Sequence, residues 1–94
     1  RRLASLRADA EAARNRAQAI DAEVYPRAAK ALAQVREGYA RGGFTFRDMQ
    51  DAADAILTAQ DRWLDAITQY RALQTEIDRL TGRFGDAQPV EIKQ

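Results

Sequence analysis

Apolar and alanine residues recur from Leu3 to Tyr39 with the spacing of a single helical face. Steps of three and four residues alternate up to Val24, which is the period of a coiled-coil seam. The pattern resumes after Tyr25-Pro26, but with a step of four where a step of three is due. The stripe consists of Leu3, Leu6, Ala10, Ala13, Ala17, Ile20, Val24, Ala28, Leu32, Val35 and Tyr39.

Pro26 interrupts this stripe. Proline lacks a backbone N–H and disfavours a helical conformation in the residue before it. A step of four where three is due departs from the heptad repeat and changes the winding of the helix locally. We therefore predict one long helix with a kink and a stutter near Pro26. A break into two helices at this proline is the alternative.

The chain's only adjacent glycine pair, Gly42-Gly43, follows this stripe. Gly42 is well placed as a C-terminal cap, because glycine readily adopts the left-handed conformation found there. Thr45 and Asp48 then have the spacing of a capping box, with Asp48 at the third position of a new helix. These signals predict a turn between Arg41 and Thr45.

A second stripe begins after the turn and closes at Gly82, a second candidate cap. Leu57, Leu64 and Ala66 lie off it and widen the apolar face. This width indicates either more than one neighbouring helix or ordinary exposed apolar residues. The stripe itself consists of Phe46, Met49, Ala53, Ile56, Gln60, Trp63, Ile67 and Tyr70, and after a shift of Leu73, Ile77 and Leu80.

Together these patterns predict an all-α chain folded as a long, antiparallel, coiled-coil-like helical hairpin. The hairpin covers residues 1–82, with helices at 2–41 and 46–81 joined by a tip at 42–45, and residues 83–94 form a flexible C-terminal tail. Such a hairpin is about 55 to 60 Å long at about 1.5 Å per residue. Two copies can cover each other's remaining apolar edges by pairing into a four-helix bundle. Because the chain opens on Arg1-Arg2-Leu3, already in heptad phase and without a methionine, we expect it to be a segment of a longer protein.

Charge divides between the two arms. The net charge of the chain is +1, which does not favour nucleic acid as a partner. Residues 1–41 carry 9 Lys/Arg against 5 Asp/Glu, or +4, whereas residues 46–82 carry 4 Arg against 7 Asp/Glu, or −3. Antiparallel arms of opposite charge attract each other modestly.

The residues that usually perform catalysis are missing. The sequence contains neither cysteine nor histidine, so thiolate chemistry and the commonest metal ligands and general bases are excluded. Carboxylates recur at Asp48, Asp51, Asp54, Asp61 and Asp65, but at helical spacing they are typical of a solvated face. We therefore expect no enzyme activity, no metal site and no cofactor.

The tip is the best candidate for a site. Phe44 and Phe46 flank Thr45 at the end of a hairpin, where few neighbours are available to bury them. Glycine also allows a partner to approach the backbone closely. The alternative is that one phenylalanine folds back as a staple over the second helix. The predicted partner-binding residues are Tyr39, Gly42, Gly43, Phe44, Thr45 and Phe46.

Several short runs between residues 20 and 82 occur in a familiar order and spacing. They are Val24-Tyr25-Pro26-Arg27-Ala28, Ala31-Leu32, Gly38 to Phe44, Asp48 to Ala52, Tyr70 to Leu73, and Leu80-Thr81-Gly82. In this arrangement the chain resembles the C-terminal periplasmic helical hairpin of TolC-like outer-membrane efflux factors, and most closely their cation-efflux, CzcC-like subgroup.

The resemblance implies that the chain is the periplasmic portion of a Gram-negative outer-membrane protein. The whole protein would be a trimeric channel, and this hairpin would form part of its α-helical tunnel. The tip would dock the periplasmic adaptor (membrane fusion) protein of a tripartite pump that exports heavy metals or other cations. The inner-membrane pump would then be an indirect partner, and the isolated chain is expected to form a dimer. The alternative function is a stand-alone coiled-coil interaction or scaffold module with no role in transport.

Overall fold

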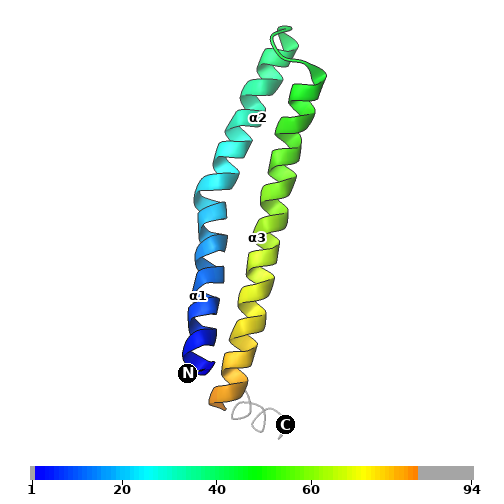
Figure 1. Cartoon of the computed structure of the whole chain (residues 1–94). Helices are drawn as coiled ribbons and strands as arrows, with labels where there is room; N and C mark the ends of the chain where they lie inside the picture. The colour runs from blue at the N-terminus through cyan, green and yellow to red at the C-terminus, as the bar shows by residue number, and fades with distance from the viewer. Residues whose placement is uncertain (1, 83–94) are drawn as a thin grey trace, which may run out of the picture.

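Two long helices lie side by side and antiparallel in the computed structural model, which describes residues 2–82 (Figure 1). The first arm consists of α1 (Arg2–Ala19), a π-helical turn η1 (Ile20–Val24) and α2 (Tyr25–Ala40). The second arm is α3 (Phe46–Thr81), along which all three elements of the first arm pack. The predicted all-α helical hairpin is confirmed. Arg1 and the expected tail at 83–94 lie outside the described residues.

The contact between the arms is built mainly from alanine. Among the described residues, five of the seven buried apolar side chains are alanines. Small side chains let two helix backbones approach closely, so the arms pack without a thick core. The buried residues are Ala10, Ala13 and Ala17 of α1, Leu32 of α2, and Ala59, Ala66 and Ile77 of α3.

The predicted stripe of α3 is wrong at Gln60 and in leaving out Ala66. Gln60, predicted on the stripe, is exposed, whereas Ala66, predicted off it, is buried together with Ala59. Steps of three and four residues alternate along this seam, although Trp63 and Leu80 at two of its positions are exposed, so no shift before Leu73 is needed. Its positions are Met49, Ala52, Ile56, Ala59, Trp63, Ala66, Tyr70, Leu73, Ile77 and Leu80.

The stutter near Pro26 takes the form of the π-helical turn. The N–H of Tyr25 donates to the carbonyl of Ile20, five residues earlier, and Val24 and Tyr25 both keep right-handed helical angles. A π-turn accommodates one extra residue without ending the helix. Pro26 consequently lies in the first turn of α2, where a missing N–H is tolerated. The helix does not break at this point.

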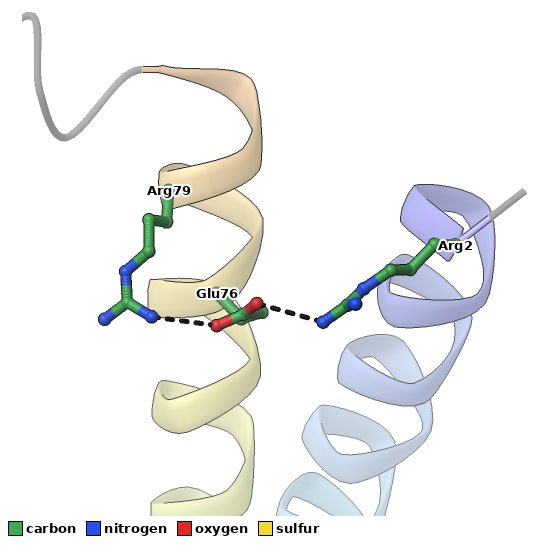
Figure 2. A network of polar contacts seen from close by, with 3 residues as sticks. All are labelled: Arg2, Glu76 and Arg79. Atoms are coloured by element: carbon green, nitrogen blue, oxygen red, sulfur yellow. Dashed lines mark hydrogen bonds and ion pairs between the residues drawn. The ribbon is translucent and has the colours of Figure 1, made fainter.

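The end of the hairpin opposite the tip, which we call the open end, is held by a three-residue ion network (Figure 2). Glu76 of α3 accepts from Arg2 of α1 and from Arg79 one turn further along α3, each at 3.1 Å. Further along the rod Arg16 donates to the side-chain oxygen of Gln69 at 2.6 Å. These polar contacts join the arms at two points along the hairpin. Because they are exposed to solvent, they fix the register of the arms more than they stabilise the fold.

Candidate partner-binding tip

The first arm ends in a Schellman motif. The N–H of Gly43 donates to the carbonyl of Gly38 at 2.7 Å, and the N–H of Gly42 donates to that of Tyr39 at 2.9 Å. Gly42 has a φ of 85°, the left-handed conformation that the motif requires at this position. The expected cap at Gly42 is therefore confirmed. It turns the chain sharply away from the axis of α2.

The second arm begins with a complete capping box. The N–H of Asp48 donates to Thr45 Oγ1 at 3.0 Å, and the N–H of Thr45 donates to Asp48 Oδ2 at 2.9 Å. Both bonds satisfy amide groups that a helix start would leave without partners. Thr45 thus has a structural role in addition to its predicted place in the binding surface.

Between these two caps Phe44 folds back onto the last turn of α2. Its ring lies over Gly38, where any Cβ atom would overlap the ring carbons. This differs from the expected alternative of a staple over the second helix, because the ring rests on the first arm. Phe44 nevertheless keeps 44% of its surface exposed, so its outer face remains available to a partner.

Tyr39 and Phe46 form a second aromatic contact across the turn. Their ring centroids lie 6.2 Å apart at an angle of 55°, a tilted geometry that is favourable for aromatic pairs. Both rings are also partly exposed. The last residue of the first arm's stripe and the first residue of α3 therefore meet, and three aromatic side chains gather around the glycine turn.

Charges next to the tip are paired within their own helices. Arg41 lies 2.8 Å from Glu37, and Arg47 lies 3.6 Å from Asp51, in each case one turn apart. Their partners reduce the net field at the end of the hairpin. What the tip presents is thus an apolar, aromatic surface beside bare glycine backbone. We define the tip surface as Tyr39, Gly42, Gly43, Phe44, Thr45 and Phe46.

Gly38 supports the tip surface although it is not one of the predicted partner-binding residues. It supplies both the carbonyl that closes the Schellman motif and the bare backbone on which Phe44 rests. Its separation of five residues from Gly43 is the spacing of that motif's long hydrogen bond, and this signal was available in the sequence.

A hollow lies between the two arms, halfway along the hairpin and beside the π-helical turn η1. We call it the central groove. It has a volume of about 410 Å³ and draws its walls from both arms. It is lined by Ile20, Asp21, Tyr25, Ala59, Gln60, Trp63 and Leu64.

Within residues 2–82, no three acidic side chains gather closely enough to hold a metal ion. Asp48 serves as a helix cap and Asp51 pairs with Arg47. No helix in this range is both long and apolar enough to cross a membrane.

Comparison of the chain with protein-family models, with curated proteins and with solved structures gave no match.

Proposed function

We propose that this hairpin forms part of the periplasmic α-helical tunnel of a trimeric outer-membrane efflux channel. Its tip surface docks the periplasmic adaptor protein of a tripartite export pump for heavy metals or other cations. The inner-membrane pump is engaged indirectly through that adaptor. The hairpin itself is a structural and docking element and performs no catalysis.

The observation that carries this proposal is the construction of the tip. Two caps fix the turn, while Phe44, Tyr39 and Phe46 each remain roughly half exposed around it. An isolated turn needs no aromatic side chains, and aromatic residues are the usual anchors of protein interfaces. The motifs from Val24 to Gly82 that resemble the efflux factors give the same position to the docking tip.

The test is a substitution of Phe44 by alanine in the full-length protein. The change removes an exposed ring but neither cap, so the helical content should be retained. Adaptor binding should weaken at least about tenfold, the effect of losing about 1.4 kcal/mol at an interface anchor. Efflux should fall in parallel.

Two controls separate docking from general damage. Gln34→Ala changes an exposed polar residue of α2, and Leu80→Ala removes an apolar side chain about as exposed as Phe44 but close to the open end. Both should leave adaptor binding unchanged. If Phe44→Ala behaves like these controls while the fold is preserved, the tip is only a turn and docking fails as an explanation.

A stand-alone interaction module is the second candidate. It is favoured by the central groove, an apolar surface away from the tip that offers a partner a docking face along the side of the hairpin. In that case the Phe44 and Gln34 variants would bind partners equally well, and substitutions in the central groove would be the ones that abolish binding.

A further inference from the structure

We propose that the chain pairs with a second copy of itself through the central groove, and that both tips lie at the same end of the resulting four-helix bundle. The inference concerns a different surface from the tip and does not depend on an efflux role.

Exposed apolar side chains concentrate around this groove. Leu64 and Trp63 of α3 are 56% and 39% exposed, and Tyr25 faces them from the first arm at 37%. Leu57 lies two turns before Leu64 on the same side of α3 and is more than half exposed. Water-exposed apolar surface gathered at one place marks an interaction site.

The shape of the groove fits a pair of helices. Ile20 and Tyr25 line one wall, whereas Trp63 and Leu64 line the other, so the hollow opens between the arms along one face of the hairpin. A second hairpin laid on this face brings its own two helices and its own groove. The same patch then covers itself, as in a two-fold symmetric dimer.

Charge selects the direction in which the copies lie. A two-fold axis perpendicular to the length of the hairpin would place the first arm of one copy on the first arm of the other. Residues 1–41 carry a net charge of +4, so these two arms would repel each other. An axis along the hairpin instead sets each first arm on the partner's α3, whose residues 46–82 carry −3. Opposite charges attract, so charge favours this second arrangement, whereas every helix is antiparallel to both of its neighbours in either arrangement. In this second arrangement the tips coincide.

The contact area is sufficient for a stable dimer. With its 36 residues, α3 is about 54 Å long, and two adjacent helices are about 20 Å wide. One face therefore offers about 1,000 Å² per copy, or about 2,000 Å² for the pair, which lies within the range of specific interfaces. Trp63 and Tyr25 provide the large aromatic groups that dominate such interfaces.

The first measurement uses the unmodified 94-residue chain. Trp63 is its only tryptophan and lines the groove, so its emission reports whether the groove is covered. On dilution, sedimentation should show a dimer becoming a monomer while the Trp63 emission shifts to longer wavelength. A monomer at high micromolar concentration would overturn the proposal, as would dissociation without any change in emission.

The second measurement compares two leucines of α3. Leu64→Gln should raise the dimer dissociation constant at least tenfold, whereas Leu80→Gln should leave it unchanged, because Leu80 is similarly exposed but outside the groove. Both variants should retain helical circular dichroism. Equal effects of the two substitutions would overturn the groove as the interface.

The third measurement fixes orientation. The sequence has no cysteine, so Gln50→Cys, at an exposed site near the tip, carries a single spin label. Tips at the same end place the two labels within about 25 Å. Tips at opposite ends place them about 40 Å apart, because Gln50 lies about 18 Å along the helix from the groove centre. The longer distance would overturn the proposed orientation. None of these measurements involves an adaptor, so their failure leaves docking at the tip untouched.

Discussion

Phe44 lies against the bare backbone of Gly38, so closely that a Cβ atom at residue 38 would fall 2.6 Å from the ring's Cε2 atom. Gly38 and Phe44 are thus a matched pair: the absence of one side chain makes room for the other. The ring in turn holds the chain between the two caps against the end of α2.

This pairing predicts an unusual sign for a helix substitution. Gly38→Ala should stabilise an ordinary helix by about 0.5 to 1 kcal/mol. We expect that gain in a Phe44→Ala background, where the ring is gone. When Phe44 is present, we expect Gly38→Ala either to leave the free energy of unfolding unchanged or to lower it. Urea unfolding of all four proteins of this double-mutant cycle gives the coupling energy, expected to be about 1 kcal/mol or more. Equal effects in both backgrounds would contradict the contact.

The two glycines of the tip should respond differently to alanine. Gly42→Ala forces a side chain into a left-handed conformation at φ 85° and should destabilise the hairpin by about 1 to 2 kcal/mol. Its neighbour is the control: Gly43 has no positive φ, and a Cβ atom there would lie 3.4 Å from the Gly38 carbonyl oxygen. Gly43→Ala should therefore change the free energy of unfolding by no more than about 0.5 kcal/mol. Thermal unfolding of the two variants measures this difference, and comparable losses would rule out backbone strain as its cause.

Loss of the capping box should lower stability through the start of α3. Thr45→Ala removes the acceptor for the Asp48 N–H and should cost about 1 kcal/mol. The double variant with Asp48→Ala should lose less than the two single losses combined, because the two hydrogen bonds support each other. Thr58→Ala, at an exposed site in the middle of α3, should instead stabilise slightly. Chemical denaturation of the unmodified chain and of these four variants provides the test, and a loss for Thr58→Ala as large as that for Thr45→Ala would argue against capping.

The π-helical turn should tolerate a deletion that a regular helix does not. Removing Ala22 from η1 returns the first arm to α-helical winding and keeps both of its halves in phase with α3. Removing the exposed Arg62 from α3 instead rotates all later seam residues by about 100°. We expect cooperative melting to survive the first deletion and to be lost with the second. Similar melting of the two deletion variants would show that η1 does not absorb the extra residue.

Local signals made much of the fold predictable. The ends of the helices depend on a few adjacent residues whose chemistry is nearly context-free, so Gly42, Gly82, Thr45 and Asp48 all have the capping roles expected of them. The stutter at Pro26 was likewise visible as one extra residue in the spacing. The π form of that turn was not, since it depends on how both halves of the arm meet α3.

The phase of α3 was harder to predict because alanine carries little hydrophobic signal. Gln60 and Ile67 continue a plausible stripe of longer side chains, whereas the buried positions are Ala59 and Ala66. Close helix packing selects small residues, and only the presence of the opposite arm shows which alanines are enclosed. The packing of Phe44 against the first arm could not be predicted from the sequence either, because a ring at a turn can rest on either arm.

The alanine seam also determines how the hairpin comes apart. Its buried residues lie singly along the rod from the open end up to Leu32 and Ala59, so each turn there is supported by its immediate neighbours and not by a shared centre. Unfolding should then begin at the open end and proceed along the hairpin turn by turn. Amide hydrogen exchange should be fastest around Arg2 and Gly82. At the other end, the two caps and the short connection between the arms hold the tip together. The hairpin can therefore unfold locally at its open end while the tip surface stays folded.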